Sequence, residues 1–69
     1  MKYLIKSNAT DAEFLDSDIL IGDKPIKVFK IRDYFVTRKL QIKEIAKLTG
    51  LKYGMVSEVI NEIIKRRLF

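Results

Sequence analysis

Gly50 separates two stretches of helical apolar spacing, and this division most limits the folds open to the chain. Before it, residues 43–49 predict a helix with Ile45 and Leu48 on its inner side. After it, residues 53–67 predict a longer helix. Glycine adopts the left-handed conformation that ends a helix and reverses the chain without a steric penalty. The sequence therefore predicts two helices joined by a short turn.

Side chains near this turn have the sizes that two closely packed helices require. Ala46 is small where the helices approach each other, and Leu51 is placed to fill the corner between them. The longer helix carries an apolar stripe on its inner side: Val56, Val59, Ile60, Ile63 and Ile64. An ordinary helical hairpin with a glycine cap is the alternative. Because the residue types at these positions fit one another, the sequence favours a helix-turn-helix that spans roughly residues 42–61.

Another helix is expected before this motif. Asp23 is a suitable N-cap, and Pro25 fits the first turn, where a missing amide costs little. The helix is predicted to end near residues 37–39, after apolar residues at helical spacing: Val28, Ile31 and Phe35. Three aromatic residues on it are interpreted as core rather than as a base-stacking platform: Phe29, Tyr34 and Phe35.

A small amount of β-structure is expected in the N-terminal part of the chain. Residues 3–5 and 18–21 are β-prone runs. Between them, Thr10 and Glu13 have the spacing of a capping box, which predicts one helical turn. We expect the two strands to form an N-terminal β-hairpin beside an extended link at residues 40–42, because their backbone groups otherwise lack partners.

The size and composition of the chain exclude several classes of protein. Sixty-nine residues make a single domain, 1–69, and without cysteine or histidine it has no disulfide, zinc finger, or catalysis based on those residues. An enzyme is not expected, since the acidic cluster at residues 11–18 has no evident pocket. No cofactor or metal is expected either. The apolar runs are too short for a membrane span or a signal peptide, so we expect a cytoplasmic protein without a membrane partner.

Charge is distributed unevenly along the chain. Residues 1–23 hold two basic and five acidic side chains, a net charge of −3, whereas residues 24–69 hold twelve basic and four acidic ones, a net charge of +8. Such an asymmetry suggests a polyanionic partner for the basic part, either nucleic acid or an anionic membrane surface. A lysine-rich surface that only keeps a small protein in solution is the alternative.

The turn motif closely resembles the helix-turn-helix headpiece of the lac-repressor family. The matching residues run without a gap: Ala46, Gly50, Leu51, Val56, Ser57, Val59, Ile60 and Asn61. The resemblance covers about a quarter of the chain. It implies that Tyr53 and its neighbours enter the major groove of DNA, with Ser57 and Asn61 placed to hydrogen-bond the DNA backbone.

Two positions depart from that family. Gly54 has no side chain where the family often has a base reader, and Glu58 is acidic where the family often has arginine, so the base preference must differ. A glutamate can accept a hydrogen bond from the amino group of cytosine. Pairing of Glu58 with a lysine is the favoured interpretation. The family motif also lies at the start of its chain, before a ligand-binding domain, so its regulatory arrangement does not transfer.

The order of elements is similar to that of winged-helix proteins, including MarR-like regulators and phage or plasmid replication proteins. The expected fold is therefore α+β and mainly helical, a three-helix helix-turn-helix core of winged-helix type. A β-hairpin wing normally follows the third helix in those families. Here the N-terminal strands are expected to replace it, with a fragment of a longer protein or a wingless domain as the alternatives.

These features predict a transcriptional regulator that binds double-stranded DNA in a sequence-specific way. Specificity is assigned to Tyr53, Met55 and Glu58, with Gly54 beside them. Orientation on the phosphates is assigned to Lys43, Lys47, Lys52, Ser57 and Asn61, with Lys65 as a further candidate. A homodimer is a candidate assembly, through Leu68 and Phe69 or through a strand edge. The alternatives are a replication-initiator or recombination accessory domain and a protein–protein interaction module.

Overall fold

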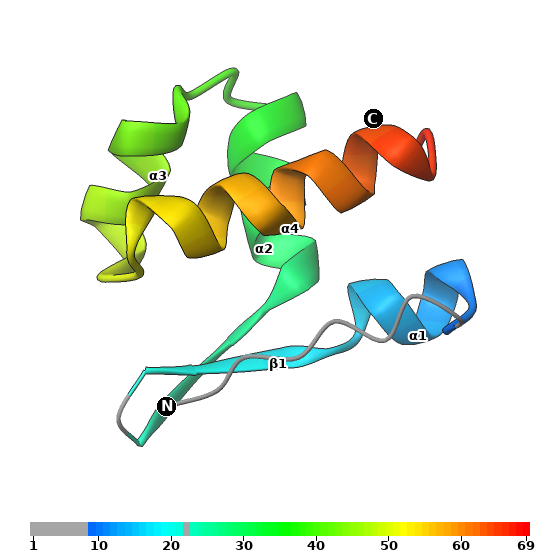
Figure 1. Cartoon of the computed structure of the whole chain (residues 1–69), viewed down its shortest axis with the longest axis horizontal. Coiled ribbons are helices and arrows are strands. Elements are labelled where there is room, and N and C mark those ends of the chain that lie inside the picture. The colour runs from blue at the N-terminus through cyan, green and yellow to red at the C-terminus, as the bar shows by residue number, and fades with distance from the viewer. Residues whose placement is uncertain (1–8, 22) are drawn as a thin grey trace.

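Four helices and one β-hairpin form the part of the chain that the computed structural model describes, residues 9–21 and 23–69 (Figure 1). In chain order they are α1 (Asp11–Leu15), β1 (Asp18–Ile21), β2 (Lys24–Lys27), α2 (Val28–Val36), α3 (Ile42–Thr49) and α4 (Tyr53–Lys65). This confirms the α+β, mainly helical class. The strand expected at residues 3–5 lies outside the described residues.

The short helix α1 begins with the capping box that the sequence predicts. The hydroxyl of Thr10 accepts a hydrogen bond from the amide of Glu13 at 3.2 Å, and the Glu13 carboxylate accepts one from the Thr10 amide at 2.9 Å. Two of the backbone donors that a helix N-terminus leaves without partners are thereby satisfied. Phe14 projects from α1 into the core and is 1% exposed.

The hairpin uses a different second strand from the one expected. β1 pairs in antiparallel register with β2, Ile19 opposite Ile26 and Leu20 opposite Pro25. The prediction of a helix beginning at Asp23 and Pro25 was therefore wrong. Proline fits here because each strand of a two-stranded sheet has an open edge, where the amide that proline lacks is not required. The predicted pairing of residues 3–5 with residues 18–21, beside residues 40–42, involves residues outside the described part of the chain.

Helix α2 begins directly after β2, without a connecting residue. Its N-cap is Lys27, which makes no side-chain capping bond, rather than the expected Asp23. The amide of Val28 instead donates to the carbonyl of Ser17 at 2.9 Å, so the first residue of the helix is tied to the start of β1. The helix ends at Val36, close to the predicted position.

The three longer helices form the core, and α1 and the hairpin lie along one side of it (Figure 1). Helix α2 packs against α1, β2, α3 and α4. The buried core consists of apolar side chains: Phe14, Ile19, Val28, Ile31, Ile45, Leu51, Val56, Val59, Ile60 and Ile63. Three side chains expected inside are about half exposed or more: Phe29, Leu48 and Ile64. The helical periodicity of the sequence marks a wider stripe than these short helices bury.

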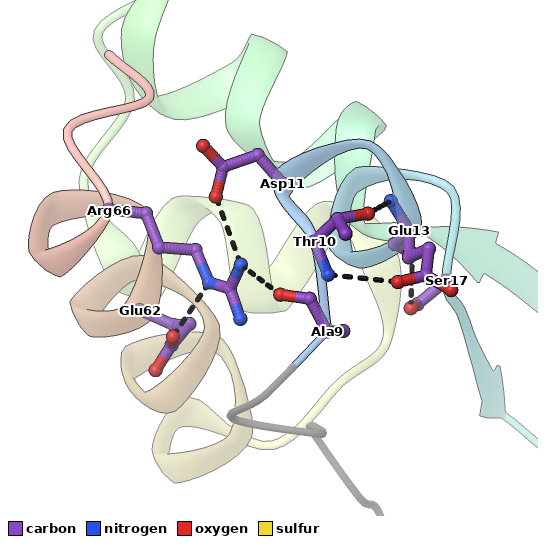
Figure 2. Close-up of polar contacts among 7 residues, drawn as sticks. All are labelled: Ala9, Thr10, Asp11, Glu13, Ser17, Glu62 and Arg66. Atoms are coloured by element: carbon purple, nitrogen blue, oxygen red, sulfur yellow. Dashed lines mark hydrogen bonds and ion pairs between the residues drawn. The ribbon is translucent and has the colours of Figure 1, made fainter.

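Arg66 joins the two ends of the described chain (Figure 2). Its guanidinium donates to the Glu62 carboxylate at 2.7 Å, the Ala9 carbonyl at 2.7 Å and the Asp11 carboxylate at 3.0 Å. It also lies 4.7 Å from the centre of the Phe14 ring. The side chain is only 10% exposed, so these contacts fix the N-terminus of α1 against the last turn of α4.

No helix within residues 9–21 and 23–69 is long and apolar enough to cross a lipid bilayer.

Backbone conformation rather than side-chain packing accounts for glycine at position 50, in the turn between α3 and α4. Gly50 caps α3 with φ of 79°, and its amide donates to the Ala46 carbonyl at 2.9 Å. A Cβ built on Gly50 would meet nothing within 4 Å. A side chain there would therefore be strained only because of the positive φ.

We expect Gly50→Val to reduce the free energy of unfolding by more than about 1 kcal/mol, because a β-branched residue is poorly tolerated at positive φ. Gly50→Asn is the matched control and should lose clearly less, since asparagine tolerates the left-handed region. Urea denaturation followed by circular dichroism measures both. Equal stability of the valine variant and the parent would contradict a left-handed conformation at this turn.

Candidate functional site

Three residues connect α3 to α4, and the side chains around them hold the two helices together. Leu51 is 7% exposed and fills the corner, while Val56 and Val59 are fully buried on the inner side of α4. Ala46 is partly buried against the same core. The burial of Leu51, Val56 and Val59 confirms the inner positions that the sequence predicts for them.

Two interactions that the sequence analysis missed fix the ends of α3. Gln41 and Glu44 form a capping box at its start, although glutamine is an unusual N-cap residue. At its end, the hydroxyl of Thr49 donates to the Ile45 carbonyl at 2.7 Å and accepts from the Leu51 amide at 3.3 Å. The hydroxyl of Thr49 thus links the last turn of α3 to the connection, and the orientation of α4 is set locally.

Helix α4 turns one polar ridge towards solvent. Gly54, Glu58, Asn61 and Lys65 are exposed and follow one another at intervals of four, three and four residues, which places them on one face. Tyr53 is 59% exposed at the N-terminal end of the helix. We call these five residues the α4 ridge.

Four of the predicted site residues are lysines, two on α3, one at the turn and one on the α4 ridge: Lys43, Lys47, Lys52 and Lys65. All are exposed, and the ion pairs of the described residues involve none of them. Lys43 and Lys47 lie one turn apart on α3, and Lys52 is the N-cap of α4. Their charges are therefore open to an anionic partner.

The ten residues predicted from the sequence come together on α3, the turn and α4, but they differ in accessibility. Met55 and Ser57 are half-buried, and Met55 packs against the core. The other eight are exposed. Met55 is therefore the member of the set with the least free surface for contact with a partner molecule.

Glu58 is exposed to solvent, as the favoured interpretation expects, but it has no lysine three or four residues away along its own helix. Its neighbours at three and four residues are Met55, Asn61, Gly54 and Glu62, none of them a cation. No ion pair with Glu58 occurs within the described part of the chain. An exposed carboxylate thus stands in the middle of the α4 ridge without a charge partner among the described residues.

Two other cations are held by the acidic N-terminal segment. Lys27 forms ion pairs with Asp18 at 3.2 Å and Asp16 at 3.3 Å, and hydrogen bonds to Asp18 and then Asp16 raise the pKa of its ammonium group. Hydrogen bonds to Glu62 and then Asp11 likewise raise the pKa of Arg66. The charges of both cations are partly neutralised within the molecule.

A hollow of about 400 Å³ lies between β2, α2 and the end of α3. Phe29, at 54% exposed, and Leu48, at 60% exposed, line it together with Tyr34 and Lys30. The sequence analysis assigned both aromatic residues to the core. The feature that distinguishes Phe29 is the strand β2 before α2, because this strand moves the N-cap of α2 from the expected Asp23 to Lys27, four residues later.

The described residues contain no cluster of three or more aspartate, glutamate, histidine or cysteine side chains able to hold a metal ion. No known protein family, curated protein or solved structure matches the chain.

Gly54 is a direct probe of the α4 ridge. A Cβ at this position would meet nothing within 4 Å, so no contact within the described fold requires glycine there. Gly54→Ala should raise the free energy of unfolding by about 0.5–1 kcal/mol, since glycine is a poor helix former. It should lower affinity for any partner that closely approaches the α4 ridge. Thermal unfolding and binding measured on the same samples test this; lower stability of the variant would contradict an open helical site.

Proposed function

We propose that this protein binds double-stranded DNA, with α3 and α4 acting as a helix-turn-helix and the α4 ridge lying in the major groove. The observation that carries the proposal is the combination of a Gly50 turn, an exposed polar ridge on α4, and four exposed lysines on α3, the turn and α4 that have no ion pair among the described residues. Sequence-specific regulation of transcription is the function that this arrangement suits best.

The dimensions of α4 are compatible with this role. Thirteen residues make a helix about 20 Å long, and the major groove of B-DNA is about 12 Å wide and accepts one helix. A helix-turn-helix inserts the N-terminal residues of its second helix most deeply. Tyr53, Gly54 and Glu58 would then face base edges.

The lysines supply the electrostatic part of the proposal. Lys43 and Lys47 on α3 and Lys52 at the turn would contact phosphates on one side of the groove. Lys65 lies about 18 Å along α4 from Tyr53, so it would reach the backbone further along. Ser57 and Asn61 would donate hydrogen bonds to phosphate oxygens. Contacts of this kind orient the protein without selecting a sequence.

Glu58 gives the proposal a specific element. A carboxylate facing phosphates is repelled unless it accepts a hydrogen bond, and the amino group of cytosine is the donor that the major groove offers to it. Glu58 would therefore weaken binding to most DNA sequences. Sequences with cytosine at the contacted position would be bound more tightly, because the hydrogen bond to cytosine offsets the repulsion, so Glu58 would confer selectivity by disfavouring the other sequences.

The proposal includes the type of fold. Helices α2, α3 and α4 would correspond in order to the three helices of a winged-helix-like domain, with the β-hairpin before the first helix rather than after the third. A replication or recombination protein would use the same contacts.

A protein–protein interaction module is the second candidate. The hollow beside Phe29 and Leu48 favours it, because exposed apolar side chains gathered in one place often mark a protein contact. Fluorescence anisotropy with random duplex DNA at low salt separates the two candidates. Selection of bound sequences from a random duplex library then tests specificity; failure of the protein to bind any duplex would refute the proposed function.

Affinity for random duplex should fall with salt at a log-log slope of about −3 to −6, as roughly four to six phosphates are neutralised. Lys47→Ala should reduce this slope by about 1 without changing sequence preference. Lys30→Ala is the control, since it removes the same charge from an exposed position on α2, which is not part of the proposed helix-turn-helix. Equal effects of the two substitutions would mean that net charge alone drives binding.

Tyr53→Ala should cost about 1–3 kcal/mol on the selected duplex and little on random duplex, because a base contact contributes only at the preferred sequence. Phe29→Ala is the matched control, an aromatic side chain of similar exposure on α2. Competition titrations on both duplexes measure the difference. Equal losses on the two duplexes would exclude Tyr53 as a base reader.

A further inference from the structure

An exposed apolar surface lies where the ends of α2 and α4 meet. Four side chains line a shallow hollow of about 440 Å³ there: Phe35, Val36, Ile64 and Phe69. Ile64 is 46% exposed and Phe69 is 65% exposed, while Phe35 and Val36 are half-buried. We call these four residues the C-terminal patch. Apolar side chains gathered in this way on a surface often mark a contact with another molecule.

Hydrogen bonds fix the backbone on both sides of the C-terminal patch. After α2, the Leu40 amide donates to the Tyr34 carbonyl at 3.0 Å. After α4, the Leu68 amide donates to the Ile63 carbonyl at the same distance. The side chain of Arg32 on α2 also donates to the Leu68 carbonyl, which ties the two helix ends together. The hollow is therefore preformed, and a partner that enters it has little to order.

Basic side chains predominate around the C-terminal patch. Residues 32–39 and 61–69, which contain and surround its members, carry six basic and two acidic side chains, a net charge of +4. Three of these cations are exposed and form no ion pair with any described residue: Lys39, Lys65 and Arg67. Each is at most three residues from a member of the patch, which limits the separation of their Cα atoms to about 11 Å. Positive charge open to an anionic group therefore lies close to the hollow.

Two of these cations stand where the backbone favours glycine. Lys39 has φ of 55° and Arg67 has φ of 57°, both in the left-handed region. This conformation is strained for a residue with a Cβ, and helices commonly end with glycine in it. Attraction to the helix dipole explains a cation near a helix end, but any position in the last turn would provide it. A contact with a partner explains the two basic side chains better than the fold does.

We infer that the C-terminal patch binds an acidic amphipathic helix of a partner protein. Bulky apolar side chains of that helix enter the hollow, and its aspartate and glutamate side chains lie against Lys39, Lys65 and Arg67. Amphipathic helices bind apolar grooves in this way, with their apolar residues at intervals of three and four on one face. The contact requires no DNA, so it does not rest on the proposed function.

Other occupants fit the C-terminal patch less well. Its four side chains are all apolar, so they offer no polar group that would orient a small ligand or bind a phosphate. A second copy of the chain carries the same cations and would be repelled by them. A lipid bilayer is a flat surface that would leave the hollow unfilled, whereas side chains projecting from a helix fill it.

Selection from a displayed library of random peptides tests the occupant directly. The peptides have about 16 residues, enough for about four helical turns, and the full chain is the target at about 0.15 M salt. We expect the enriched peptides to have a net negative charge and large apolar residues at intervals of three and four. Enrichment of neutral or basic peptides, or of no peptide, would overturn the inference.

Substitutions in the C-terminal patch locate the contact. In fluorescence anisotropy with an enriched peptide, Ile64→Gln and Phe69→Gln should each weaken binding at least about tenfold. Leu20→Gln is the matched control, because Leu20 is 48% exposed on β1 and lies outside the patch. Circular dichroism should show all three variants folded, since the replaced side chains are exposed. Unchanged peptide affinity in both patch variants would overturn the inference.

Glycine substitutions test the two strained cations. Lys39→Gly and Arg67→Gly should each weaken peptide binding about two- to fivefold, because each removes one charge facing the peptide. Both should also raise the midpoint of urea denaturation, since glycine relieves the backbone strain. Arg67→Lys is the control that keeps the charge and should keep the affinity. Glycine variants that bind as tightly as the parent, or that are less stable than it, would contradict a contact of these side chains with a partner.

The other occupants are tested with the same variants. Binding of the chain to vesicles of phosphatidylglycerol, or self-association in sedimentation equilibrium, would overturn the inference if Ile64→Gln abolished it and no acidic peptide bound. A chain that binds acidic peptides through the C-terminal patch but no duplex DNA would refute the proposed function and support this inference. A chain that binds duplex DNA but no acidic peptide would refute this inference alone.

Discussion

Burial of the inner face of α2 is the constraint on which the other elements depend. Val28 and Ile31 are 1% and 0% exposed, and the helix that carries them contacts α1, β2, α3 and α4. Without disulfides and with no buried polar or charged side chain among the described residues, this apolar contact is the main cohesive force. A substitution on the inner face of α2 would therefore loosen the hairpin and the α3–α4 pair at once.

Local structure could be predicted from the sequence where a residue type is suited to only one local conformation or contact. Thr10 and Glu13 form the expected capping box, and Gly50 takes the expected left-handed conformation. The secondary structure around Pro25 could not be predicted in this way, because proline is equally suited to a first helical turn and to an open strand edge. The choice depends on the pairing of Ile19 with Ile26, a tertiary contact with no local signal. Leu48 and Phe29 show the same limit, since periodicity gives a face but not its width.

The candidate site combines residues whose place was predictable with one whose surroundings were not. Lys43, Lys47 and Lys52 are exposed, as their positions on α3 and in the turn suggest. The sequence shows that no cation lies three or four residues from Glu58 on α4, but only the structure shows that no residue of another described element pairs with it. The acidic N-terminal segment engages Arg66 and Lys27, so the basic charge open to a partner is concentrated on fewer residues than the sequence implies.

The contacts of Arg66 with the start of α1 also bear on the rate of unfolding. They join residues 55 and 57 positions apart, whereas the hairpin and the turn between α3 and α4 close over two and three residues. Because closing a long loop costs entropy before any contact compensates for it, we expect the Arg66 contacts to form after the folding transition state. Interactions that form late leave the folding rate unchanged and slow unfolding. A single arginine near the end of the last helix would thus lengthen the lifetime of the native state.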